Sequence, residues 1–309
     1  MSFLSDTRTE LCSAKTEKKA LAVAECYGIL LYCRTFTPRE IRISTGSDIF
    51  AARLPRLFHR AFGLEFDRLP ESDSGTRFTF LIHDPKKLSV IYQAFGYDAG
   101  GVLTPHVNFA VLEAEGSSTA FIRGAFLAGG SVSDPENSFH LELATSHSGI
   151  TAEVHSILLD LGLSPKESRR GANSLLYFKQ ADLIADFLTV IGARSAAMTV
   201  MTARVDREMR NMVTRQINCD SANADKVVAA AQEQIAAIRR LMEGPGLDSL
   251  PEALQETALL RIANPEASLA DLSVLSSPSV SKGCLAYRLK KLAALAEELC
   301  PGDEPGPEI

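Results

Sequence analysis

At 309 residues the chain is long enough for two or three domains with a sizeable core. Its 46% hydrophobic and 23% charged residues are typical of a globular protein, and no apolar run approaches the roughly 20 residues that span a bilayer. The formal net charge of −6 excludes a protein coated in positive potential. Nucleic-acid binding would therefore need a local basic patch.

The N-terminus is polar and charged, which predicts no secretory signal and no membrane partner. Six scattered cysteines form no CxxC pair, so we expect reduced thiols and a cytoplasmic protein. The six histidines show no metal-ligand spacing; the closest set, His140, His147 and His155, fits neither HExxH nor a zinc-finger pattern. We therefore predict no metal and no cofactor.

Periodicity in the first half of the chain predicts an alternation of helices and short strands. Helices are expected at residues 14–32, 49–62 and 85–95, and strands at residues 41–45 and 77–83. Glycines at 63 and 96 mark the ends of the second and third helices.

The same order of elements returns about one hundred residues later. Helices are expected at residues 121–129, 152–161 and 181–191, and strands at residues 139–145 and 174–179. Such a duplication predicts an α+β domain with internal pseudo-two-fold symmetry, built from two helix–strand–strand–helix repeats.

One helix of each repeat carries small residues four positions apart. In FIRGAFLAGGSVSDP (residues 121–135), Gly124 is followed by Ala128 and Ala125 by Gly129. The matching helix of the first repeat carries Ala24 and Gly28, so we expect the two helices to pack closely together on the symmetry axis. The alternative interpretation of residues 121–135 is a Gly-rich loop between a strand and a helix.

A basic segment, residues 199–218, follows the duplicated domain. Arg204, Arg207, Arg210 and Arg215 outnumber its acids, and three of them share one broad side of a helix. This side either contacts DNA phosphates or is a solvated surface. A long helix over residues 222–242 then ends at Gly244-Pro245-Gly246, a hinge or domain boundary.

Three helices are predicted beyond this boundary, at residues 250–263, 269–275 and 279–299. Ser249 and Ser268 are the expected N-caps of the first two. The short turn between the last two predicts a helix-turn-helix, and an apolar stripe on the third helix would pack on the others; it contains Leu285, Leu289, Leu292, Leu295 and Ala296.

The third helix is the local basic patch, because no acidic residue lies between Asp271 and Glu297. The candidates for base edges in the major groove are the residues of its N-terminal part: Ser279, Ser281, Lys282 and Tyr287. The candidates for phosphate contacts lie further along: Arg288, Lys290 and Lys291. The alternative is a basic surface helix without a partner.

Two resemblances are consistent with this interpretation. LAGGSVSDP is similar to the LAGLIDADG motif of homing endonucleases, whose motif helices pack at a pseudo-dyad beneath a DNA-binding saddle of sheets. The chain resembles the WhiA family of bacterial regulators more closely, through RGAFLAGGSVSDP and HLEL (residues 123–143), ADFLTVIGA (185–193), MRNMVTRQINCDSAN (209–223), GLDSLPEAL (246–254) and SVSKGCLAYRLKKL (279–292).

The LAGLIDADG resemblance implies an acid near the end of each motif helix that holds a catalytic metal. Asp134 occupies that position in the second repeat, and the repeat alignment places Cys33 opposite it. A neutral thiol cannot share a hard cation, so we predict a scaffold that has lost nuclease activity and has no catalytic residues. An active homing endonuclease remains the enzymatic alternative.

The sequence does not decide what the sheet face binds. Its strands carry Arg42, Arg77 and Lys179 beside Glu142, which suits DNA no better than it suits a small molecule or a protein. A scaffold that senses a ligand or protein through this face is therefore a further alternative.

The WhiA resemblance implies a sequence-specific transcription regulator linked to cell division and, in some lineages, sporulation. The implied partners are double-stranded DNA and either another transcription regulator or RNA polymerase, and the implied location is the nucleoid. The predicted domains are the two LAGLIDADG-like repeats, a helical linker, the helix-turn-helix domain and a disordered tail, at residues 1–118, 119–205, 206–245, 246–300 and 301–309 respectively.

Overall fold

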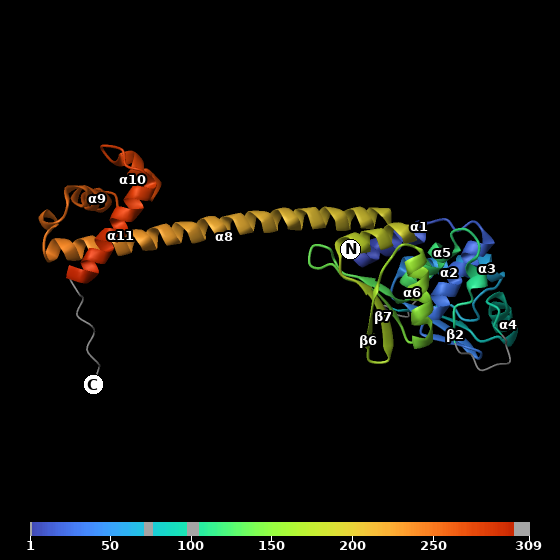
Figure 1. Ribbon diagram of the computed structural model, residues 1–309. Helices are drawn as coiled ribbons and strands as arrows, with labels where there is room; N and C mark the ends of the chain where they lie inside the picture. The colour runs from blue at the N-terminus through green and yellow to red at the C-terminus, as the bar shows by residue number, and fades with distance from the viewer. Residues whose placement is uncertain (1, 71–76, 98–104, 300–309) are drawn as a thin grey trace, which may run out of the picture. The chain divides into compact units, whose positions relative to one another are not determined.

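The structure is a computed structural model that describes residues 2–70, 77–97 and 105–299 (Figure 1). The chain folds as two compact units, Met1–Glu208 and Met209–Ile309. The predicted disordered tail lies outside the described residues.

The first unit contains two sheets and the helices that cover them. Its α-helices are α1 (Phe3–Ser13), α2 (Lys19–Tyr32), α3 (Asp48–Phe62), α4 (Pro85–Ala94), α5 (Ser117–Gly129), α6 (Thr151–Asp160) and α7 (Ala181–Ile191), with 3-10 turns η1 (Phe109–Leu112) and η2 (Ser148–Ile150). Its strands are β1 (Thr35–Thr37), β2 (Glu40–Thr45), β3 (Phe78–Ile82), β4 (Gly130–Val132), β5 (Leu141–Thr145), β6 (Lys166–Arg170) and β7 (Asn173–Phe178).

The duplication predicted from the sequence is confirmed by the order of these elements. The first sheet runs β1-β2-β3 and the second β4-β5-β7-β6, and each consists of antiparallel neighbours. The buried pairs correspond as well, because Phe36 faces Ile41 where Val132 faces Leu141. Strands β1, β4 and β6 were not predicted: β1 and β4 have three residues each, and the sequence of β6, KESRR, is exposed throughout and has no apolar alternation.

Helices α2 and α5 pack against each other on the pseudo-dyad. A Cβ atom at Gly28 would lie 2.0 Å from the carbonyl oxygen of Phe121, and one at Gly124 would lie 2.0 Å from that of Glu25. Glycine is therefore the residue that allows the two backbones to touch at both points. The helical interpretation of residues 121–129 is confirmed, and the Gly-rich loop is excluded.

The second unit is all helical and has a core of its own. It consists of the C-terminal part of α8 (Arg194–Glu243), the turn η3 (Leu247–Ser249), α9 (Glu252–Ala263), α10 (Leu269–Leu275) and α11 (Lys282–Leu299). Ala237, Ile238 and Leu241 of α8 pack in this core beside Leu254 and Leu289. The predicted boundary at residue 246 is thus too late, because the end of α8 is part of the helix-turn-helix core.

Candidate nucleic-acid interface

Hydrogen bonds of serine side chains hold the turn between α10 and α11. Ser268 begins α10 with a capping box in which its side chain and that of Asp271 bond reciprocally to backbone amides. Within the turn, Ser273 Oγ donates to the Val280 carbonyl at 2.6 Å, and the Val280 amide donates to Ser276 Oγ at 2.8 Å. The predicted cap at Ser268 is confirmed. The one at Ser249 is wrong, because Ser249 lies in η3 and donates to the Gly246 carbonyl at 2.7 Å.

Helix α11 buries one side and exposes the other. Leu285, Leu289, Leu292 and Ala296 are at most 1% exposed, which confirms the predicted stripe at these positions. At 100° per residue, the opposite side is centred on Tyr287 and flanked by Lys290 and Lys291. Tyr287 is 66% exposed and both lysines are exposed. We call these three residues the outer face of α11.

Within the described ranges, the lysines of α11 have no local neutralisation. Over the part of the chain that the structure describes, Lys282, Lys290 and Lys291 form no ion pair with a carboxylate. Arg288 differs, because its guanidinium donates to the carbonyl of Ala253 and the hydroxyl of Thr257 on α9, both at 3.4 Å. The lysines are thus available to an external anion, whereas Arg288 also braces α11 against α9.

The two serines predicted for the groove already have intramolecular roles. Ser281 Oγ accepts the amide of Cys284 at 3.3 Å and so caps the start of α11. The hydroxyl of Ser279 donates to the carbonyl of Ser273 at 3.4 Å. A contact of either residue with a base edge remains a prediction, as do those of Lys282 and Tyr287.

The arginines of α8 also have partners within the chain. Arg204 pairs with Asp182 and with Glu208, and the Arg207 guanidinium lies 4.4 Å above the Phe139 ring and donates to the Pro135 carbonyl. Arg215 donates to the Asn211 carbonyl at 3.2 Å, and Arg210 has an interaction of its own. Phosphate contacts by these residues remain predictions. For Arg204 and Arg207, phosphate would have to replace contacts that hold α8 to the first unit.

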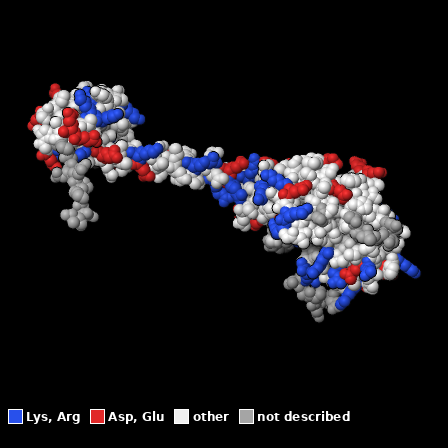
Figure 2. All heavy atoms as spheres, turned by 60° about the horizontal axis from the view of Figure 1, so that its bottom comes forward, with Lys and Arg blue, Asp and Glu red and all other residues white. Residues whose placement is uncertain are grey.

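The exposed sheet face of the first unit carries paired charges. Arg42 bonds to Glu40 at 2.8 Å, and Glu142 accepts from Arg170 at 3.0 Å and lies 3.1 Å from His140. Lys179 lies 5.3 Å from the centre of the Tyr177 ring, whereas Arg77 is exposed beside a shallow pocket of about 220 Å³. On the view of Figure 2, basic and acidic side chains are interspersed over this unit. The charges of Arg42 and Glu142 on the sheet face are thus paired within the chain.

The positions at the ends of the two motif helices differ from those expected. The two contacts at the dyad are symmetric, since Gly28 meets the Phe121 carbonyl and Gly124 meets the Glu25 carbonyl, so Gly28 corresponds to Gly124. Five residues further along each helix, Cys33 corresponds to Gly129. The predicted pairing of Cys33 with Asp134 is therefore wrong. Asp134 lies in the β4–β5 connection, residues 133–140, which is longer than the turn at residues 38 and 39 of the first repeat. Its carboxylate is exposed and accepts the amide of Glu136 at 3.0 Å, as in a turn.

Neither helix end can provide a carboxylate. Cys33 is buried, its thiol donates to the Leu30 carbonyl at 3.2 Å, and burial raises the pKa of this thiol to about 12. A Cβ at Gly129 would lie 2.5 Å from the Ala144 carbonyl oxygen and 2.8 Å from the Tyr32 ring, so no side chain fits there. Residues 2–70, 77–97 and 105–299 contain no group of three His, Cys, Asp or Glu side chains placed to hold a metal ion. Within the same ranges, no helix is both long and apolar enough to cross a membrane.

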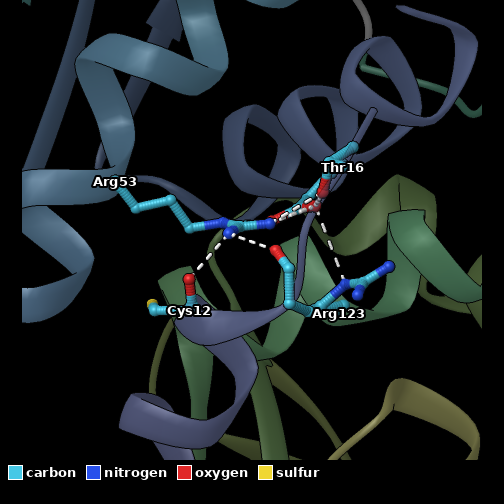
Figure 3. Close-up of polar contacts among 6 residues, drawn as sticks. Cys12, Thr16, Arg53 and Arg123 are labelled. Atoms are coloured by element: carbon cyan, nitrogen blue, oxygen red, sulfur yellow. Dashed lines mark hydrogen bonds and ion pairs between the residues drawn. The ribbon is translucent and has the colours of Figure 1, made fainter. Parts of the chain in front are cut away.

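A buried charge cluster at the edge of the dyad was not predicted. Glu25 of α2 is fully buried and accepts two bonds from Arg53 of α3, at 2.9 and 3.0 Å, with Arg123 of α5 at 3.7 Å (Figure 3). Thr16 also donates to this carboxylate, at 3.0 Å. The sequence feature that could have predicted this cluster is a single acid inside the apolar segment LAVAECYGILLY, because a charge in a core needs partners.

Known proteins resemble the chain over nearly its whole length. The family model of the WhiA LAGLIDADG-like domain matches residues 118–210, and that of the WhiA C-terminal HTH domain matches residues 213–296. The probable cell division protein WhiA of Clostridium botulinum is 30% identical over 98% of this chain and 100% of its own length. The protein of that name from Desulfitobacterium hafniense is 33% identical, over 97% of this chain and 96% of its own.

A solved structure has the same fold. The crystal structure of full-length DUF199/WhiA from Thermotoga maritima aligns with a TM-score of 0.58 at 23% identity, and covers 98% of this chain and 100% of that one. This likeness extends the shared fold to both units.

Proposed function

This chain belongs to the WhiA family, and on that premise we propose that it is a non-catalytic, sequence-specific DNA-binding transcription regulator of cell division. The outer face of α11 reads the major groove, and the protein works in the cytoplasm on the nucleoid. Another transcription regulator or RNA polymerase is its protein partner, and in a host that sporulates the same control extends to sporulation.

The observation that carries the proposal is the outer face of α11. Tyr287, Lys290 and Lys291 project from the second helix of a helix-turn-helix, and the described residues hold no carboxylate paired with the lysines. Exposed, unpaired lysines on such a helix suit the phosphates that flank a major groove, and an exposed aromatic ring suits contact with base edges or thymine methyl groups.

The absence of a catalytic step is supported by the two helix ends. Metal-dependent phosphodiester cleavage needs oxygen ligands at the reacting phosphate, and the equivalent positions hold a buried protonated thiol and a glycine without room for a side chain. We expect no nicking of supercoiled DNA in Mg²⁺ or Mn²⁺. Cleavage that disappears in Asp134→Ala would refute this part of the proposal.

The salt dependence of binding to a random-sequence duplex tests the phosphate contacts. Each neutralised phosphate contributes about one unit to the slope of log K against log salt, so Lys290→Ala/Lys291→Ala should lower the slope by about two units. A matched control, Arg39→Ala/Lys86→Ala, removes two exposed charges from the first unit and should leave the slope unchanged. Equal slopes for the parent and the Lys290/Lys291 variant would overturn the assignment of α11.

Selection of bound sequences from a random duplex library tests specificity. The parent should enrich a defined motif, and Lys282→Ala or Tyr287→Ala should bind that motif more weakly by about 1–3 kcal/mol if the residue contacts a base. The same variants should change binding to random DNA much less. A library that returns no motif would contradict sequence-specific regulation.

A further inference from the structure

The first unit contains a basic groove away from its sheet face. It has a volume of about 530 Å³ and lies between the α1–α2 connection and α3. Its lining includes the apolar side chains of Ile49, Ala52 and Leu57, and its cationic side chains are those of Lys15, Arg53, Arg56 and Arg60. The groove thus combines apolar and cationic side chains in its lining, a composition that suits a small-molecule site.

The arginines of the groove share one face of α3. Arg53, Arg56 and Arg60 are spaced i, i+3 and i+7, which places like charges next to one another along the helix. Such spacing disfavours a helix by a few tenths of a kcal/mol per pair unless an anion offsets it. Arg53 has its anion in Glu25, whereas no carboxylate among the described residues pairs with Arg56 or Arg60.

Within the residues that the structure describes, three cations of the groove have no carboxylate partner. Lys15 and Arg56 form neither a hydrogen bond nor an ion pair through their side chains, and Arg60 makes one bond, of 2.7 Å, to the carbonyl oxygen of Glu17. Glu17 also lines the groove, but its carboxylate forms no ion pair with any of the three. Three cations therefore border one cavity without a carboxylate to neutralise them.

Arg53 fixes the wall of this groove. Its guanidinium bonds to the buried Glu25 and donates to the carbonyl oxygens of Cys12 and Ala14, both at 2.8 Å (Figure 3). The end of α1 and the segment that carries Lys15 are thus tied to α3. A wall that is formed before binding lowers the ordering cost that a ligand must overcome.

We propose that this groove binds an organic polyphosphate of the nucleoside di- or triphosphate class. Guanidinium groups bind phosphate oxygens through paired charge-assisted bonds, and three unpaired cations match the charge of a short phosphate chain. The apolar side chains of the lining receive the nucleoside. A concave site of this volume suits a small ligand, whereas a duplex backbone is followed by cations on an open surface.

Isothermal titration of the full-length chain at constant ionic strength tests the proposal. The probes are ATP, GTP, inorganic tripolyphosphate and adenosine. ATP or GTP should bind with a saturable isotherm and more tightly than tripolyphosphate, and adenosine should bind at least tenfold more weakly than ATP because it lacks the phosphate chain.

Variants assign the binding to the groove. Arg56→Ala should weaken nucleotide binding about tenfold or more, and Arg60→Ala similarly, because each removes a charged donor to phosphate. Arg56 is exposed, so its variant should melt at the temperature of the parent. The matched control is Arg39→Ala, an exposed arginine of the same unit outside the groove, which should bind nucleotide as the parent does.

Several results would overturn the proposal. Lack of saturation by ATP and GTP up to about 1 mM would refute a nucleotide site of useful affinity. Equal losses of nucleotide affinity in Arg39→Ala and Arg56→Ala would show that the binding reflects general electrostatic attraction and not a site in the groove. Equal affinities for tripolyphosphate and ATP would refute the nucleoside part. If a duplex displaces the nucleotide and Arg56→Glu weakens duplex binding as much as nucleotide binding, the groove is a DNA contact instead.

Discussion

The pseudo-dyad and the outer face of α11 differ in whether their charged side chains have partners within the chain. At the dyad, glycines bring two backbones into contact, and the buried carboxylate of Glu25 is paired with Arg53. On the outer face of α11, Lys290 and Lys291 are exposed, and no carboxylate in the described ranges pairs with them. Satisfied groups stabilise a fold, whereas charges without an internal partner are available to a ligand.

This contrast explains how a helix pair that resembles the centre of an enzyme can be structural. The chemistry of a nuclease would require acids at Cys33 and Gly129, and close packing of the helices and strands occupies that space instead. We therefore assign a structural role to the dyad and place recognition on α11. Four predictions test this division, ordered from the largest expected change in unfolding free energy to the smallest.

The largest effect is expected at the dyad. Gly124→Val should lower the free energy of unfolding of the first unit by about 3 kcal/mol or more, because its Cβ would collide with the Glu25 carbonyl oxygen. Hydrogen exchange of the α2 and α5 amides, read by mass spectrometry, measures the loss. The control is Gly283→Ala on α11, where a Cβ has open space and a gain of up to about 1 kcal/mol is expected. Equal protection in the two variants would show that the dyad tolerates bulk.

The next effect concerns a paired charge in the first unit. Burial disfavours the charged form of Asp67, but Lys87 at 2.6 Å and the amides of His83 and Asp84, both at 2.7 Å, outweigh it and lower the pKa of Asp67 to about 2. The folded pKa lies below the unfolded value of about 3.9, so this carboxylate contributes about 2 kcal/mol above pH 4. That contribution is lost as the pH falls from about 4 to about 2.

Unfolding of the parent and of Asp67→Asn at several pH values measures this contribution. The variant should be less stable by about 2 kcal/mol at pH 7, and the difference should disappear near pH 2. A difference that stays constant down to pH 2 would contradict the proposed source of the pKa shift.

A smaller effect is expected at the start of α10. Ser268→Ala removes the capping box and should destabilise the second unit by about 1 kcal/mol. Ser249→Ala is the matched control, because Ser249 caps no helix amide, and it should cost less. Urea unfolding followed by circular dichroism compares the two. The same midpoint for both variants would argue against the capping box as a source of stability.

The smallest effect on stability is expected on the outer face of α11. Lys290→Ala/Lys291→Ala should change the unfolding free energy by less than about 0.5 kcal/mol, because both side chains are exposed and unpaired in the described structure. The same variant should lose DNA affinity. A loss of more than about 1 kcal/mol in stability would mean that weaker DNA binding reflects partial unfolding, and the contrast between the two regions would fail.

Local chemistry in the sequence was sufficient to predict much of the fold. The repeat of helices and strands, the small-residue helices, the cap at Ser268 and the helix-turn-helix follow from residue periodicity and from capping rules, which act over one or two turns. The basic composition of α11 could likewise be read directly, because no acid interrupts it between Asp271 and Glu297.

Only the tertiary structure decided which residues meet. The correspondence of Gly28 with Gly124 depends on how two helices cross. It shows that the residue at the acid position of the second repeat is Gly129 and not Asp134. The partners of Glu25 come from segments far apart in sequence, and the groove is formed where α3 meets the α1–α2 connection. Side-chain periodicity gives the face of each helix but not the neighbour that this face will meet, because long-range packing sets that neighbour.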